Sequence, residues 1–210
     1  GGCTLNHAVH HIDIFQWMMG MPEQVTAVMS NTSHDNAEVE DLSVAILSYP
    51  RALAQITSSV VHHGQEQQLI FQGEKARVSM PWRVTASVSK ENGFPLANPQ
   101  LEQEIEALVS QAAPLKYTGH KGQLDNVLSA IENGTGEVLV TGHEGRKTLE
   151  LITAIYQAAS TGKAVKLPLR QDSPFYTREG MMANAPRFYD KKNSVVGFNK
   201  NEITVSGESK

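Results

Sequence analysis

Apolar and polar residues follow two different spacings along this chain of 210 residues, and each spacing predicts one kind of element. Apolar residues that recur every three to four positions predict helices with one buried face. Short β-rich runs bounded by turn residues predict strands. In chain order, the expected elements are a helix over 4–19, strands over 25–30, 42–49, 52–61, 68–72, 76–80 and 83–90, a loop over 93–99, and helices over 101–111, 121–132 and 145–160.

Glycine and proline residues mark the ends of these elements. Gly20 and Pro22 stop the first helix. Pro50-Arg51 and Gly73-Glu74-Lys75 each separate two strand-like runs at hairpin distance, which makes the joined strands antiparallel. One helix, then consecutive strands, then further helices predict an α+β fold, with an antiparallel-rich mixed β-sheet and helices packed on one face.

The character of the chain changes near residue 170, and this change sets the expected domain organisation. Residues 1–170 are expected to form an α/β domain of ordinary size. Residues 171–210 are polar and loop-like, and they contain a possible hairpin over 194–198 and 202–206. We expect them to form a C-terminal extension that packs on the domain or on a neighbouring subunit.

Charge and cysteine content narrow the class of protein. The formal net charge is −4 with a pI of about 6.1, and the basic residues are scattered, which argues against nucleic-acid or anionic-membrane partners. No apolar stretch reaches the length of a membrane span. Because Cys3 is the single cysteine, no disulfide can form within the chain, which is compatible with the cytoplasmic location that we expect.

Four polar or aromatic residues form a stripe at the edge of the apolar face of the first predicted helix. Asn6, His10, Asp13 and Trp17 lie at helical spacings of four, three and four residues, which stacks them along one side. In this stripe Asn6 is suited to orient a substrate hydroxyl, His10 to accept its proton, and Asp13 to fix the imidazole tautomer. An ordinary surface hydrogen-bonding pair of His10 and Asp13 is the alternative.

A metal site on the same helix is a further alternative, and it would make the protein a metal-dependent hydrolase. His7 and His11 have a spacing that metal ligands use on helices, and His10 lies between them. However, His7 and His11 share a side of the helix with Ile14 and Met18, whereas His10 points about 100° away from His11. We therefore expect no metal in this chain.

Two further features bear on the site. His63 follows the predicted strand 52–61, where it either enters the site or belongs to a polar turn. None of the 16 glycines is spaced as G-x-G-x-x-G, so the chain shows no dinucleotide-binding fingerprint and no cofactor-binding residue is expected in it.

Motifs spread over residues 1–170 resemble one protein family. Gly1-Gly2, Asn6-x-x-x-His10-x-x-Asp13 and Trp17-x-x-Gly20 resemble the start of the C-terminal domain in the glucose-fructose oxidoreductase, inositol dehydrogenase and rhizopine-catabolism (Gfo/Idh/MocA) family. Further segments similar to that family follow in its order at 39–41, 49–53, 70–76, 128–131, 141–146 and 154–168.

The resemblance implies a two-domain NAD(P)-dependent oxidoreductase of which this chain is the C-terminal, substrate-binding half. A Rossmann domain that binds NAD or NADP would precede it, so we expect the chain alone to hold no cofactor and to be inactive. The start at Gly1, without methionine, agrees with a fragment that carries half of an active site. The substrate would be a sugar, a sugar derivative or a cyclitol, and the open sheet face would form a homodimer or homotetramer.

The resemblance also implies roles for single residues. His10 would be the catalytic residue that takes the hydroxyl proton as hydride leaves the substrate carbon. Asn6 stands where many members have Asp and some have Asn, and it would act beside His10. Asp13, Trp17 and His63 would bind the substrate or support the catalytic residues. The alternative is a non-catalytic dimerisation or binding module of the same fold.

Overall fold

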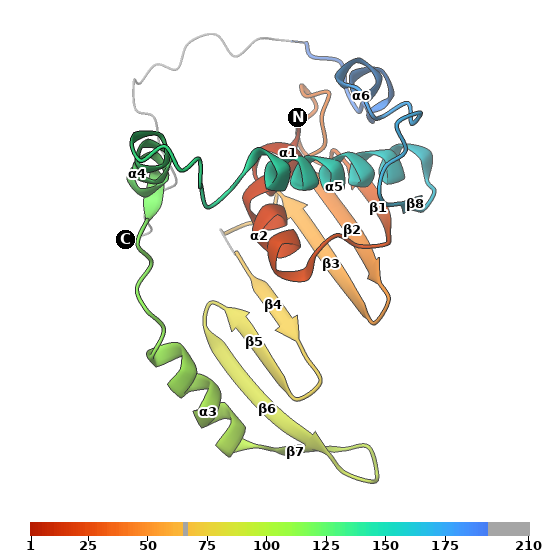
Figure 1. The fold of residues 1–210 in the computed structure, drawn as a ribbon. Helices are drawn as coiled ribbons and strands as arrows, with labels where there is room; N and C mark the ends of the chain where they lie inside the picture. Colours follow the sequence, from red (N-terminus) through yellow and green to blue (C-terminus); the bar gives the residue numbers. More distant parts are fainter. Residues whose placement is uncertain (65–66, 193–210) are drawn as a thin grey trace. The chain divides into compact units, whose positions relative to one another are not determined.

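The fold was examined in a computed structural model that describes residues 1–64 and 67–192 (Figure 1). The chain divides into two compact units. Among the described residues, the first unit contains Gly1–Val61 and the chain from Arg146 to Lys192, and the second lies within His62–Gly145. The first unit is therefore built from two segments that are far apart in the sequence.

An antiparallel four-stranded sheet with the order β3-β2-β1-β8 lies in the first unit. A turn at Pro50-Arg51 joins β2 to β3 and places Tyr49 opposite Ala52, so the predicted hairpin is confirmed. The strands are β1 (Gln24–Ser30), β2 (Leu42–Tyr49), β3 (Ala52–Ser59) and β8 (Val165–Lys166).

One face of this sheet is covered. Ala45 and Leu47 on β2 are buried, and they lie opposite Ala27 and Val25 on β1. Val25 in turn lies opposite Val165 on β8, which extends the apolar row across the sheet. Side chains alternate between the two faces of a strand, so these residues share one face.

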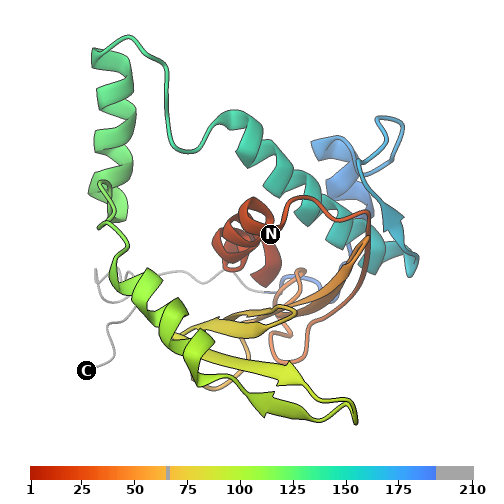
Figure 2. The same ribbon diagram turned by 60° about the horizontal axis from the view of Figure 1, so that its bottom comes forward.

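Helices pack on the covered face (Figure 2). They are α1 (Cys3–Asn6), α2 (Val9–Met19) and α5 (Gly142–Thr161), whose residues from Arg146 onward belong to this unit. Burial of a large aliphatic side chain stabilises a fold by about 1.5–3 kcal/mol. The core of the unit lies between the sheet and the buried apolar side chains of α2 and α5. These side chains include Ile12, Phe15, Leu151, Ile152 and Ile155.

The opposite face of the same sheet is open within the described structure. Val28 on β1 is 68% exposed, Ile46 on β2 is 37% exposed and Leu53 on β3 is 76% exposed. Thr26 and Gln55 on this face are exposed as well. The first unit thus has one covered and one open sheet face, and the predicted α+β fold with helices packed on one face is confirmed.

The second unit contains another antiparallel four-stranded sheet, with the order β4-β5-β6-β7. Helix α3 packs on β6, and two hydrogen bonds join them. The Glu102 carboxylate accepts the Ala86 N–H at 2.8 Å, and the Glu106 carboxylate accepts the indole N–H of Trp82, directly before β6, at 3.0 Å. The elements of this unit are β4 (Leu69–Gln72), β5 (Ala76–Met80), β6 (Arg83–Ser89), β7 (Pro95–Ala97), α3 (Pro99–Ser110) and α4 (Gly119–Glu132).

The described part of the segment after residue 170 belongs to the first unit and contacts its N-terminal portion. Phe175 is only 3% exposed, and the Phe188 N–H donates to the Glu38 carbonyl at 3.1 Å. This segment also contains a short helix, α6 (Arg178–Asn184). The hairpin predicted over 194–206 lies outside the described residues.

Four elements differ from the sequence-based expectations, and one of them is the short strand β8, which was not predicted. The helix predicted over 4–19 is two helices, with a break at His7 and Ala8. The predicted loop 93–99 contains β7, which begins at Pro95, a residue that an edge strand tolerates because it needs no N–H there. Helix α6 was not predicted, although Thr177 caps it by accepting the Gly180 N–H at 3.1 Å.

Among the described residues, no helix combines the length and the apolar character that crossing a bilayer requires.

Candidate active site

The predicted site residues lie on both sides of the break between α1 and α2. The N–H groups of His7 and Ala8 both donate to the Cys3 carbonyl at 3.0 Å, which ends α1 after one turn. Helix α2 begins at Val9 and still carries His10, Asp13 and Trp17 on one side, because they are three and four residues apart. Asn6 belongs to α1, so the single four-residue stripe is wrong as a description of one helix.

His10 lies in the first turn of α2 and is exposed. Within the described residues, no hydrogen bond or ion pair involving the His10 imidazole is found. An exposed imidazole without a protein partner has both ring nitrogens available to a ligand. Its position therefore allows His10 to bond to a substrate hydroxyl.

Asn6 is exposed, and its side-chain N–H donates to the Gly1 carbonyl at 2.7 Å. This bond fixes the amide against the first residue of the chain and leaves the side-chain oxygen of Asn6 without an assigned partner among the described residues. The structure therefore places an amide oxygen acceptor at the end of α1.

Asp13 is bonded to α5 rather than to His10. The Thr148 hydroxyl donates to the Asp13 carboxylate, and Thr148 itself is buried. Asp13 consequently joins α2 to α5 in the described structure, and no bond from Asp13 to the His10 imidazole is present there. Trp17, one turn further along α2, is 71% exposed and free to contact a ligand.

His63 lies in the second unit, in the turn that follows β3, and it is exposed. It is therefore not part of the same compact unit as His10. Within the described ranges 1–64 and 67–192, no group of three or more His, Cys, Asp or Glu side chains is arranged to hold a metal ion.

A buried carboxylate that the sequence analysis did not assign to the site anchors α1. Glu40 is 3% exposed, and its carboxylate accepts the Tyr156 hydroxyl at 2.7 Å and the Thr4 N–H at 3.0 Å. The Glu40 carbonyl also accepts the Cys3 N–H at 3.2 Å. Glu40 and Tyr156 thus hold the turn from which the site residues continue.

The surroundings of this carboxylate perturb the neighbouring ionisable groups. Burial, followed by the charge of Glu40, raises the pKa of the Tyr156 hydroxyl far above its usual range. Burial and Glu40 also raise the pKa of the Cys3 thiol to about 11. Tyr156 therefore remains a hydrogen-bond donor, and Cys3 remains a neutral thiol, at neutral pH.

The adjacent Asp41 is held in its ionised form. Burial raises its pKa, but hydrogen bonds from His34, from the Thr32 N–H and hydroxyl, and from the Ser33 N–H outweigh burial and lower the pKa to about 2. The Thr32 N–H donates at 2.8 Å and the His34 Nδ1 lies 3.0 Å from the carboxylate. The only sequence signal for Glu40 and Asp41 was their place in the segment 39–41, which suggested no role.

Comparisons with known proteins identify the family of this chain. The family model described as the C-terminal alpha/beta domain of the Gfo/Idh/MocA oxidoreductase family matches residues 1–167. No curated protein sequence matches the chain.

Solved structures of oxidoreductases share the fold. The WlbA dehydrogenase of Bordetella pertussis, crystallised with NADH and UDP-GlcNAcA, is 27% identical with a TM-score of 0.57, over 81% of this chain and 46% of that one. The aldose-aldose oxidoreductase of Caulobacter crescentus, crystallised with glycerol, is 26% identical with a TM-score of 0.58, over 80% and 48%. An NAD-binding protein of Listeria innocua, at 20% identity and a TM-score of 0.58 over 85% and 50%, shares the fold. The chain thus spans about half the length of these structures.

Proposed function

The chain belongs to the Gfo/Idh/MocA oxidoreductase family as its C-terminal alpha/beta domain, and from this membership we propose that it is the substrate-binding and oligomerisation half of an NAD(P)-dependent dehydrogenase or reductase. The reaction would take place at a carbon that carries a hydroxyl group, in a sugar, a sugar derivative or a cyclitol. The observation that carries the proposal is the exposed His10 imidazole at the start of α2, at the position of the family motif.

The substrate class is supported by two relatives above 25% identity. One was crystallised with the nucleotide sugar acid UDP-GlcNAcA, and the other is an aldose-aldose oxidoreductase. Both names refer to sugars or sugar derivatives. We extend only this shared class, and not either particular compound, to the present chain.

This chain's own residues do not fit a dinucleotide. Its glycines lack the G-x-G-x-x-G spacing with which a loop approaches a pyrophosphate. We therefore place the NAD or NADP site in a part of the intact protein outside this chain. When bound there, the nicotinamide would supply hydride transfer, and the present residues would bind the substrate and move its proton.

The proton step is assigned to His10. In the oxidising direction, a neutral His10 imidazole would accept the proton of the substrate hydroxyl, and in the reducing direction the protonated ring would return it. Asn6 would accept or orient a second hydroxyl, and Trp17 would offer an apolar face to the sugar ring. Asp13 would keep α2 in position on α5 through Thr148.

The test is turnover of the intact, full-length protein with NAD and NADP and a panel of sugars, nucleotide sugars and cyclitols. We expect His10→Ala to lower kcat by about 10²-fold or more, as for loss of a general base. His7→Ala removes another exposed histidine three residues away and should leave kcat nearly unchanged.

A near-normal rate in the His10→Ala enzyme would reject the catalytic assignment. If neither the wild-type enzyme nor the variant turned over any substrate of the panel while both bound a sugar equally well, the non-catalytic module would be the better description.

A further inference from the structure

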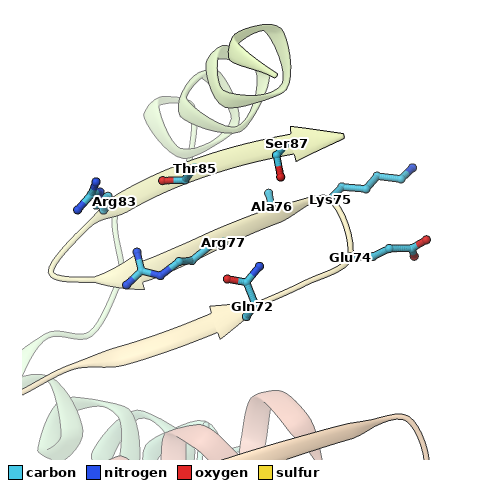
Figure 3. A pocket seen from close by; sticks show the side chains of 8 residues that line it. All are labelled: Gln72, Glu74, Lys75, Ala76, Arg77, Arg83, Thr85 and Ser87. Carbon is cyan, nitrogen blue, oxygen red and sulfur yellow. The ribbon is translucent and has the colours of Figure 1, made fainter. Parts of the chain in front are cut away.

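The sheet of the second unit carries a polar pocket of about 340 Å³ that the proposed function does not use (Figure 3). Residues two apart on a strand share a face, so Arg83, Thr85 and Ser87 on β6 line it together. Thr85 lies directly opposite Arg77 on β5, and Arg77 lies opposite Gln72 on β4. The pocket is therefore built on three adjacent strands.

The cationic side chains of this pocket lack carboxylate partners within the described structure. Lys75, Arg77 and Arg83 take part in no ion pair there. Arg77 is moreover half-buried, which makes an uncompensated charge more costly than on an open surface. By contrast, Arg146 and Arg170 each pair with a carboxylate.

One acidic residue, Glu74, also lines the pocket, and it lies at the opposite end from the two arginines. Figure 3 shows Glu74 and Lys75 together at the turn between β4 and β5, whereas Arg77 and Arg83 lie toward the other end, with Thr85 on β6 beside them. The arginine end therefore has two positive charges and no acid among the lining residues. Arg83 lies two residues from Thr85, the partner of Arg77, so the two arginines are diagonal neighbours on one sheet face. Like charges in this position repel each other, and an anion between them would relieve the repulsion.

Apart from Ala76, the uncharged lining residues carry hydrogen-bond donors in their side chains. Thr85 and Ser87 present hydroxyl groups, and Gln72 presents an amide. A phosphate group accepts many hydrogen bonds and binds guanidinium in a bidentate manner, so it matches two arginines and the Thr85 hydroxyl better than a single carboxylate does. The volume falls within the range of small-molecule pockets.

We propose that this pocket binds the phosphate or diphosphate group of a small molecule, with Arg77 and Arg83 as the main ligands and Thr85 as a further donor. The site lies wholly in the second unit and shares no residue with the His10 site, so it goes beyond the proposed function and does not depend on it.

The experiment uses the 210-residue chain and inorganic pyrophosphate as the probe. Binding is measured by isothermal titration calorimetry at constant ionic strength, and the amide resonances that shift are identified by NMR. We expect saturable binding with shifts centred on Arg77 and Thr85. Arg77→Gln and Arg83→Gln should each weaken binding by about tenfold or more, the effect of one lost charge-assisted contact.

Two further variants separate a specific site from general charge. Arg77→Lys keeps the charge but loses the bidentate geometry, so its affinity should fall between those of the wild type and Arg77→Gln. Arg51→Gln removes an exposed arginine in the first unit and should leave the affinity unchanged.

Absence of pyrophosphate binding, or equal affinity of the wild type and both glutamine variants, would overturn the proposal. Sedimentation of the same variants tests the alternative, in which the arginines contact another protein subunit. If Arg77→Gln changes the oligomeric state while pyrophosphate fails to bind, the arginines serve an acidic partner surface and the phosphate site is rejected.

Discussion

At the scale of single residues, the start of the domain depends on one buried carboxylate. Glu40 accepts bonds from the backbone of Thr4 and from the Tyr156 hydroxyl, so it connects the first turn, the segment before β2 and helix α5. Buried charges persist where such hydrogen bonds satisfy them. The segment that leads to His10 is therefore positioned by polar contacts as well as by apolar packing.

This arrangement leaves no room for a side chain at Gly2. A Cβ there would lie 2.1 Å from Glu40 Oε2 and 2.4 Å from the Glu40 carbonyl oxygen. We expect Gly2→Ala to lower the free energy of unfolding of the 210-residue chain by about 2–3 kcal/mol, as overpacking does in a tight core. Urea unfolding followed by circular dichroism measures the change.

Gly145 provides the matched control, because it lies in α5 and a Cβ there would meet nothing within 4 Å. Gly145→Ala should be neutral or stabilising by about 0.5–1 kcal/mol, since alanine favours a helix. Equal stability of the two alanine variants would contradict the crowding at Gly2.

Asp41 predicts a dependence of stability on pH. Its pKa in the folded chain is about 2, against an ordinary value of 3.8. A lowered folded-state pKa contributes stability above pH 4 that is lost as the pH falls toward 2, here about 2 kcal/mol. The stability difference between the wild type and Asp41→Asn should therefore shrink by about that amount between pH 5 and pH 2, in urea titrations.

The control for this prediction is Asp35→Asn, since the Asp35 side chain is 82% exposed and its ion pair with Lys192 spans 3.7 Å. Its effect on stability should be small and nearly constant over the same range. A constant difference for Asp41→Asn would show that its hydrogen bonds do not stabilise the ionised form.

At the scale of elements, the strands were predicted better than the helices near the site. Strands β2 and β5 have the predicted bounds, because the turn residues Pro50-Arg51 and Gly73-Glu74-Lys75 define hairpins locally. The break at His7 and Ala8 has no local signal. It follows from the bonds of Cys3 and Thr4 to Glu40, about 36 residues away, which orient the first turn independently of α2.

Contacts between distant parts of the chain also explain why Asp13 was wrongly predicted to be the hydrogen-bond partner of His10. Spacing along one helix places Asp13 near His10, but only the packing of α2 against α5 shows that Thr148, 135 residues away, donates to it. Local patterns give the face on which a side chain lies. They do not give its partner on another element.

This contact predicts an energetic coupling between α2 and α5. In a double-mutant cycle on the 210-residue chain, Asp13→Asn and Thr148→Val should show a coupling free energy of about 1–3 kcal/mol, as for a hydrogen bond to a charged group. The exposed pair Lys121 and Asp125 is the control and should couple by less than about 1 kcal/mol. A coupling near zero for Asp13 and Thr148 would show that the bond does not hold α2.

At the scale of the whole molecule, membership of the family and the α+β class were predictable, because motifs in fixed order identify both. The grouping of the strands into two sheets was not, since the boundary near His62 carries no strong composition change. For the same reason, a role for His63 beside His10 stays a prediction. The oligomeric state could not be predicted from a sequence motif either, because it depends on which surface of the folded domain is exposed.

The open face of the β3-β2-β1-β8 sheet is the surface on which the proposed oligomer would form. It exposes Val28 on β1 and Leu53 on β3, on either side of β2, whereas its other face is covered by helices. We expect the wild-type chain to sediment as a dimer or tetramer at micromolar concentration. Val28→Lys and Leu53→Lys together should shift it to the monomer, because an interface would then bury unpaired charges.

Leu149→Lys, at an exposed leucine of α5, is the matched control and should leave the mass unchanged. A monomeric wild type, or equal dissociation of the control, would exclude this face as the subunit interface.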